Sequence, residues 1–384
     1  MDHMDYHELL ARLIAFDTTS RNSNLELIAF VEDYLAGFGV PSIRVDHEPG
    51  KTNLYATIGP DVAGGIVLSG HTDVVPVDGQ PWTSDPFALT ARDDGKLYGR
   101  GVADMKGFIA VALAMVPEYV KAKLKRPIHL AFSCDEEVGC RGVRPLIAHM
   151  REHLPKPLAV IVGEPTLMKV VNAHKASHSY ETHVTGHAAH TSCAHQGVNA
   201  IMVAGELISE LNRMARELKA RGDRSGLFEP GWSTLQIGLI EGGTAKNIVP
   251  RECTFNWDMR LLPDADPDEI PARLERFSET LLPEMRAISP DTGIATKRTN
   301  IVPGLAPDAD SPAEALGLSL TGANGMAAVS YATEAGLFQQ AGIPAIICGP
   351  GSIDQAHKPD EWIAVSELEA CKGFMEKLGR HCAS

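Results

Sequence analysis

The chain of 384 residues has 44% hydrophobic residues, the composition of a globular protein that is too long for a single hydrophobic core, so we expect two domains. Its net charge of −14 and the lack of any block of basic residues argue against nucleic acid as a partner, and no apolar run is long enough to cross a membrane. Seven cysteines without CxxC spacing, and a polar start with no signal peptide, predict a cytoplasmic protein.

Helices and buried strands alternate in the first part of the chain. The apolar residues Leu9, Leu10, Leu13 and Ile14 share one face of an expected helix. The expected helices cover residues 5–15, 24–38, 105–120 and 142–149, and the expected strands cover residues 54–58, 66–69, 128–133 and 159–162. This alternation predicts an α/β fold, a three-layer catalytic domain with a mostly parallel sheet.

The pattern changes after Glu164. Tyr180, Thr182 and Val184 alternate with polar residues, as in a half-solvated antiparallel strand. Further strands are expected over 233–241 and 252–261, and amphipathic helices over 199–216 and 268–285. The first pattern returns near residue 300, with a strand over 345–348 and a helix over 366–377. We therefore expect an inserted α+β, ferredoxin-like domain over 178–299, between the two parts of the first domain, 1–177 and 300–384.

Histidine and carboxylate side chains follow the expected buried strands. His71 stands at the end of an apolar run, and Asp73 two residues later can support its imidazole. Asp104 lies in a glycine-rich loop before a helix, and the remaining positions are Glu136, Glu137, Glu164 and His357. Because sites in open α/β sheets gather at the carboxyl ends of strands, the set predicts a two-metal hydrolase. Each position taken alone also fits a turn, a helix cap or a solvated acidic pair.

The adjacent pair Glu136-Glu137 suggests a division of roles. Neighbouring side chains diverge, so one glutamate can bind a metal while the other acts as a general base toward a water molecule.

As a set, these motifs resemble the acetylornithine deacetylase / succinyl-diaminopimelate desuccinylase family of dinuclear zinc amidohydrolases. The resemblance runs from the segment Phe16-Asp17-Thr18-Thr19-Ser20 to Trp362. It implies two zinc ions per subunit, with Co²⁺ as a substitute, bound by His71 and Glu164 on one side and by Glu137 and His357 on the other. It also implies Asp104 as the bridging ligand with a cis bond to Met105, Asp73 as the residue that orients His71, and Glu136 as the general base.

The resemblance also gives the inserted domain a function, as a dimerisation and lid domain of a homodimer. The segment 186–192 resembles the one whose histidine reaches into the partner subunit's active site. His190 fits this role by register, and His187 and His195 are rivals. Asn247 and Arg260 lie in segments that resemble the motifs for the substrate carboxylate, and the guanidinium of Arg260 has the planar fork that this group needs.

Several stretches are most similar to the acetylornithine deacetylase branch, including 71–78, 96–101, 332–336 and 348–361. The expected reaction is therefore removal of acetate from N2-acetyl-L-ornithine, a step of arginine biosynthesis. Glu334 is either a partner for the ornithine ammonium or a carboxylate near a helix start. The alternatives are a succinyl-diaminopimelate desuccinylase, an acetylcitrulline deacetylase, a metallo-dipeptidase, or a metal-binding dimer without catalysis.

Overall fold

The computed structural model describes residues 4–384, which form two compact units. The main unit comprises the residues up to Ala173 together with Pro307–Ala327 and Thr333–Ser384. The inserted unit comprises His174–Ala306 and Ala328–Ala332. The chain thus changes unit at 173/174 and 306/307, where the sequence suggested 177 and 299. None of the helices within residues 4–384 has the length and apolar character that a membrane span needs.

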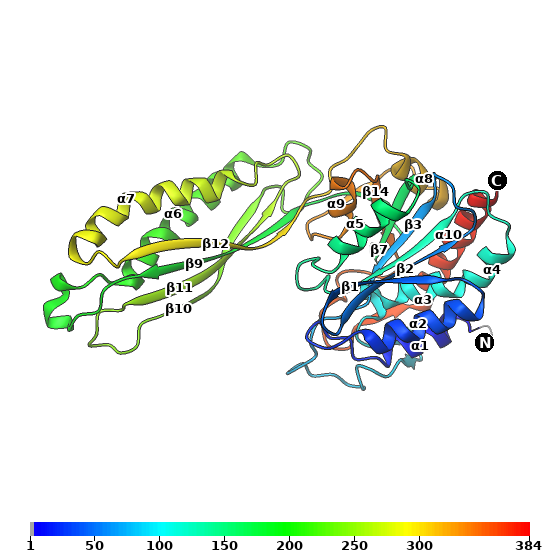
Figure 1. Ribbon diagram of the computed structural model, residues 1–384, viewed down its shortest axis with the longest axis horizontal. Coiled ribbons are helices and arrows are strands. Elements are labelled where there is room, and N and C mark those ends of the chain that lie inside the picture. The colour runs from blue at the N-terminus through cyan, green and yellow to red at the C-terminus, as the bar shows by residue number, and fades with distance from the viewer. Residues whose placement is uncertain (1–3) are drawn as a thin grey trace. The chain divides into compact units, whose positions relative to one another are not determined.

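The main unit is built on an eight-stranded sheet with the order β1-β2-β6-β3-β7-β14-β8-β13 (Figure 1). The four central strands β6, β3, β7 and β14 are parallel, whereas β1, β2 and β8 pair in antiparallel fashion. The strands are β1 (Ser42–Glu48), β2 (Lys51–Ile58), β3 (Ile66–His71), β6 (Ile128–Ser133), β7 (Ala159–Pro165), β8 (Val171–His174), β13 (Ala327–Val329) and β14 (Ala345–Gly349).

Helices cover both faces of this sheet, which gives the predicted three layers. One face packs against α1, α2, α3, α4, α8 and α10, and the other against α5 and α9. The helices are α1 (Tyr6–Ile14), α2 (Leu25–Gly37), α3 (Gly107–Ala114), α4 (Val116–Lys121), α5 (Val143–His153), α8 (Pro312–Thr321), α9 (Ala335–Gln340) and α10 (Val365–Ala383). The helix α3 is buried along its whole length, because α1 and α10 pack against its outer side.

The inserted unit has the predicted ferredoxin-like layout. Its chain order is β9 (Ala176–Thr185), α6 (Ala200–Arg221), β10 (Thr234–Gly242), β11 (Glu252–Leu261), α7 (Glu269–Ile288) and β12 (Gly293–Val302). The strands form an antiparallel sheet with the order β10-β11-β9-β12. The apolar faces of α6 and α7 share a core with the sheet, in which the ring of Trp257 stacks on Tyr180 at 4.1 Å.

The fold class is thus confirmed. The sequence did not indicate β1, β8, β13, α8 and α9, and further differences are local. The expected helix over 105–120 is wrong at its start, where the η1 turn (Val102–Lys106) has non-helical angles at Asp104 and Met105. It is also divided at Met115 into α3 and α4, and Pro117 lies in the first turn of α4. The strand β12 was missed, because its central residues Thr296–Thr299 are polar and exposed. A small sheet of β15 (Trp362–Ala364), β5 (Lys96–Tyr98) and β4 (Thr90–Arg92) was also missed.

Candidate metal centre

The parallel strands bring five of the predicted positions to one edge of the main sheet. His71 is the last residue of β3, the pair Glu136-Glu137 follows β6, and Glu164 is the penultimate residue of β7. His357 lies in the loop after β14. Parallel neighbours end at the same edge, so the apolar strand cores determine where these polar side chains meet.

Asp104 lies between the two histidines. Its Oδ1 is 3.0 Å from Nε2 of His71, and its Oδ2 is 3.3 Å from Nε2 of His357. The peptide bond from Asp104 to Met105 is cis, as the family resemblance implied. One carboxylate oxygen therefore faces each histidine, which is the geometry that a bridging ligand between two cations needs.

Each histidine has a further carboxylate beside it. Oε1 of Glu164 is 3.7 Å from Nε2 of His71, and Oε2 of Glu137 is 3.0 Å from Nε2 of His357. Two groups of donor atoms lie within 4.8 Å of one another and could each hold a metal ion: His71 with Asp104 and Glu137, and His71 with Glu136 and Glu164. Imidazole nitrogen and carboxylate oxygen are donors that suit zinc, so these side chains fit a metal centre. Both groups contain His71 and neither contains His357, so the predicted division of the ligands between two ions stays a prediction.

The electrostatics of the cluster favour bound cations. Burial, with the nearby charge of Asp104, raises the pKa of Glu164 and that of Glu137. Burial opposes ionisation of Asp104 as well, but hydrogen bonds from His357 and His71 outweigh it and lower the pKa of Asp104. Four acidic side chains crowd around two imidazoles in a buried site, and such an excess of negative charge needs compensation by positive charge.

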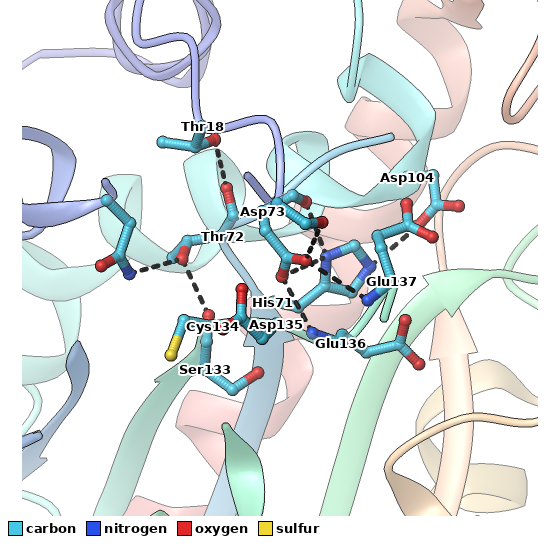
Figure 2. Close-up of polar contacts among 12 residues, drawn as sticks. Thr18, His71, Thr72, Asp73, Asp104, Ser133, Cys134, Asp135, Glu136 and Glu137 are labelled. Carbon is cyan, nitrogen blue, oxygen red and sulfur yellow. Dashed lines mark hydrogen bonds and ion pairs between the residues drawn. The ribbon is translucent and has the colours of Figure 1, made fainter. Parts of the chain in front are cut away.

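Asp73 supports the centre in a way that sequence spacing did not indicate. Nδ1 of His71 donates a hydrogen bond of 2.9 Å to the main-chain carbonyl of Asp73, while the Asp73 carboxylate is 3.7 Å away. That carboxylate instead accepts the main-chain amides of Glu136 and Glu137, as Figure 2 shows, and the hydroxyl of Ser20. The strand β3 ends at His71, so the i, i+2 rule for strands does not reach Asp73.

Glu136 is half-buried in the site beside Cys140. The Cys140 thiol donates a hydrogen bond of 3.1 Å to Oε1 of Glu136, and burial raises the pKa of Glu136 to about 8. The backbone of Cys140 has a φ of +50°, and its amide donates to the Glu136 carbonyl, so a tight turn brings the thiol back to the carboxylate. The side chains of Glu136 and Glu137 contact different partners, as expected for adjacent residues.

Glu334 lies close to the centre, but its carboxylate is already engaged. It is 1% exposed and accepts hydrogen bonds from the hydroxyls of Ser69, at 3.0 Å, and Ser133. Glu334 also precedes α9 without a side-chain capping bond. Its place at the start of α9 is the one that the second prediction gave, whereas its contact with a substrate ammonium stays a prediction.

The inserted unit brings His190 and Asn247 together and keeps Arg260 apart. The main chains of His190 and Ile248 form a bridge, and the amide of Thr191 donates to the Asn247 carbonyl. Arg260 pairs with Ser177 at the opposite end of β11 from Glu252, which pairs with Thr185 close to these loops. Eight strand residues separate the two ends, or about 27 Å at 3.4 Å per residue. One inserted unit thus cannot bring Arg260 and Asn247 to the same carboxylate.

The ring of His190 has a defined hydrogen-bond partner. Its Nδ1 accepts the main-chain amide of Ser192, at 3.2 Å, so the neutral ring carries its proton on Nε2. The rivals His187 and His195 are exposed, as His190 is. A proton on an exposed Nε2 is what a donor to a substrate oxygen requires.

Sequence reasoning missed four buried or half-buried residues that hold the centre. They are Gln80, Arg100, Glu361 and Lys51. The ammonium of Lys51 donates a hydrogen bond to the carboxylate of Asp135, which precedes Glu136. Arg100 and Glu361 stand within the motifs that carry the family resemblance, which is the one signal that could have found them.

Known proteins resemble this chain in sequence and in fold. The profile of peptidase family M20/M25/M40 matches residues 67–381. An acetylornithine deacetylase of Proteus mirabilis is 35% identical over 97% of this chain and 94% of its own length. Among solved structures, an M20 family metallo-carboxypeptidase of Sulfolobus solfataricus has a TM-score of 0.77 at 19% identity, with both chains fully covered. The YXEP protein of Bacillus subtilis, described as a dinuclear metal binding peptidase, has a TM-score of 0.63 at 16% identity and 97% coverage of both chains. The chain belongs to peptidase family M20/M25/M40.

Proposed function

We propose that this hydrolase of family M20 removes the acetyl group from N2-acetyl-L-ornithine and so produces acetate and ornithine for arginine biosynthesis. The observation that carries the amidohydrolase chemistry is the position of Asp104 between His71 and His357, with Glu136 beside them. The choice of substrate is supported by relatives named acetylornithine deacetylase, among them a Pasteurella multocida protein that is 33% identical over 98% of the chain.

The proposed cofactors are two zinc ions, for which Co²⁺ can substitute. His71 and Glu164 would hold one ion, Glu137 and His357 the other, and Asp104 both. Such ions polarise a substrate carbonyl and lower the pKa of a water molecule to about 7. The pairing of each histidine with its own glutamate supports this division.

Glu136 is the proposed general base and acid. Its carboxylate takes a proton from the attacking water and then gives that proton to the leaving amine of ornithine. Asp73 supports the role, because its bonds to the amides of Glu136 and Glu137 hold both glutamates in place. Cys140 limits the freedom of the Glu136 carboxylate through its thiol.

The inserted unit would complete the site from a partner subunit. We assign Arg260 to the substrate's α-carboxylate in one active site, and His190 and Asn247 to the active site of the partner. The separation of Arg260 from the other two along β11 supports contributions from two subunits. In this arrangement Nε2–H of His190 donates to the oxyanion as the tetrahedral intermediate forms.

A homodimer is also supported by the edge of the inserted sheet. The strand β10 is an edge strand, and its residues Leu239 and Ile240 are 71% and 54% exposed. An exposed apolar edge strand is a surface that another chain can cover. Light scattering should find a dimer, and the variant Leu239→Asp should shift it toward the monomer. The proposed cytoplasmic location is supported by the seven cysteines, which are all unpaired.

A substrate panel tests the function directly. Acetylornithine, succinyl-diaminopimelate, acetylcitrulline and a dipeptide are each incubated with the zinc-loaded protein, and the released amine is measured. We expect the highest kcat/KM for acetylornithine. A preference for another compound would assign the chain to a different M20 activity, and no turnover with any of them, with zinc bound, would favour a metal-binding protein without catalysis.

A further inference from the structure

The carboxylate of Glu361 holds the loop that carries Asp104. Its Oε1 accepts the amides of Ala103, at 2.9 Å, and Asp104, at 3.1 Å. Its Oε2 accepts the amide of Gly101, at 3.0 Å, and Nη1 of Arg100, at 2.7 Å. The side chains of Glu361 and Arg100 are each 1% exposed. Glu361 thus fills a nest of backbone amides directly before and at the proposed bridging ligand.

The same contacts continue to His357. Nη2 of Arg100 donates to Oε1 of Gln80 at 2.6 Å, and Nε2 of Gln80 donates to the main-chain carbonyl of His357 at 3.0 Å. Nη1 of Arg100 also reaches the carbonyl of Lys358, at 3.3 Å. A chain of charged and amide groups therefore connects the backbone of Asp104 with the backbone of His357.

His357 needs such support more than His71 does. The side chain of His357 is 52% exposed, and its backbone has a φ of +64° in a loop. His71 is 1% exposed at the end of a central strand, and its ring is held by the Asp73 carbonyl. Packing and a hydrogen bond to its ring thus hold His71, whereas hydrogen bonds to the main chain of its loop hold His357.

We propose that Glu361, Arg100 and Gln80 form a positioning bridge that sets the distance between Asp104 and His357 and so governs the cation position of Asp104, Glu137 and His357. This inference rests on the metal-ligand roles of the proposed function. A buried ion pair is often no more stabilising than apolar residues of the same size, so the geometry it imposes explains its presence better than stability does. The position of His71 and Glu164 shares Asp104 with the other position, but the bridge does not contact His71 or Glu164 themselves.

Two variants test the bridge, and one neighbouring variant serves as the control. Gln80→Leu removes the link to His357 and leaves the pair of Arg100 and Glu361 intact. Glu361→Gln places an amide donor against the donors of Arg100 and Gly101. The control is Asp360→Asn, because Asp360 lies next to Glu361 but bonds Thr83 and Arg92 at the surface. If Glu361→Gln fails to fold, Gln80→Leu alone still tests the bridge.

The measurement is stepwise binding of Zn²⁺ to the full chain by competition with a chromophoric chelator, with thermal unfolding recorded in parallel. We expect two ions for the wild type and the control. In Gln80→Leu and Glu361→Gln one ion should lose about 10- to 100-fold in affinity, as is typical when support of a metal ligand is removed, while the other ion loses less. Equal weakening of both ions, or no weakening, would overturn the bridge. Fewer than two ions on the wild type would instead contradict the proposed function, and with it the bridge.

Discussion

The main-chain amide of Glu136 donates a hydrogen bond of 3.0 Å to Oδ1 of Asp73. Asp73 follows β3 and Glu136 follows β6, so this bond joins the ends of two neighbouring parallel strands. Oδ2 of the same carboxylate accepts the amide of Glu137. Asp73 therefore orients the glutamate pair through its side chain and His71 through its main chain.

Replacing Asp73 should impair the glutamate pair more than it impairs His71. Asp73→Asn keeps one acceptor oxygen, whereas Asp73→Ala removes both, so we expect kcat to fall about tenfold in the first variant and about 100-fold or more in the second. Steady-state kinetics with acetylornithine measure this. A variant Asp73→Ala with wild-type kcat would show that the Glu136 backbone does not need the carboxylate.

Loss of the hydrogen bond from the Cys140 thiol to Glu136 should lower kcat measurably. Cys140→Ser retains a donor for Oε1 of Glu136, while Cys140→Ala removes it. A thiol is a weak donor, so the loss in Cys140→Ala should be about tenfold or less in kcat, with KM unchanged, and Cys140→Ser should recover most of it. Equal kcat values for the two variants would argue against the hydrogen bond.

Glu334 should matter for stability rather than for substrate affinity. Glu334→Ala leaves the buried hydroxyls of Ser69 and Ser133 without their acceptor, which should lower the free energy of unfolding by about 2–4 kcal/mol. We expect KM for acetylornithine to change less than threefold. Urea denaturation and kinetics on the same preparation separate the two effects, and a large rise in KM at unchanged stability would restore the substrate contact.

His129 should make the stability of the main unit depend on pH. It lies in β6, is 1% exposed, and bonds Thr57 through Nδ1 at 2.9 Å, and burial lowers its pKa from 6.5 to about 4. Between pH 6.5 and 4 the imidazole of His129 is therefore protonated in the unfolded chain and neutral in the folded chain. The free energy of unfolding should fall as the pH falls through this range, by about 3 kcal/mol at 1.36 kcal/mol per pH unit.

Urea denaturation at several pH values, with two glutamine variants, isolates this contribution. His129→Gln should flatten the slope between pH 4 and 6.5, while the control His153→Gln, at an exposed position of α5, should leave the slope as in the wild type. If His129→Gln shows the wild-type slope, the pH dependence of the free energy of unfolding comes from other groups.

The parts of the fold that follow from burial could be predicted from sequence. The strands β3, β6 and β7 are buried, mostly apolar segments with a carboxylate or a histidine at or just after their ends, so the location of the strands and the edge with the site followed together. The strand β12 could not be found in this way, because Thr296, Lys297 and Arg298 show no apolar alternation. Its pairing with β9 depends on tertiary contacts.

The candidate ligands were also easier to locate from sequence than the residues that hold them in place. Residue type and strand ends pointed to His71 and Glu164. The contacts of Asp73, Gln80 and Glu361 run through main-chain amides and carbonyls of distant segments, and sequence spacing does not encode such contacts. The separation of Arg260 from Asn247 likewise emerged from strand register alone.

The variant Glu136→Gln tests the central claim most directly. Zinc content per chain and turnover of acetylornithine are measured on the same sample. We expect two ions per chain and a loss of kcat of at least about 10²–10⁴-fold, because the amide cannot take the proton from water. Loss of one ion would mean that Glu136 is a ligand and Glu137 the base, and two bound ions with wild-type turnover would contradict general-base catalysis by this residue.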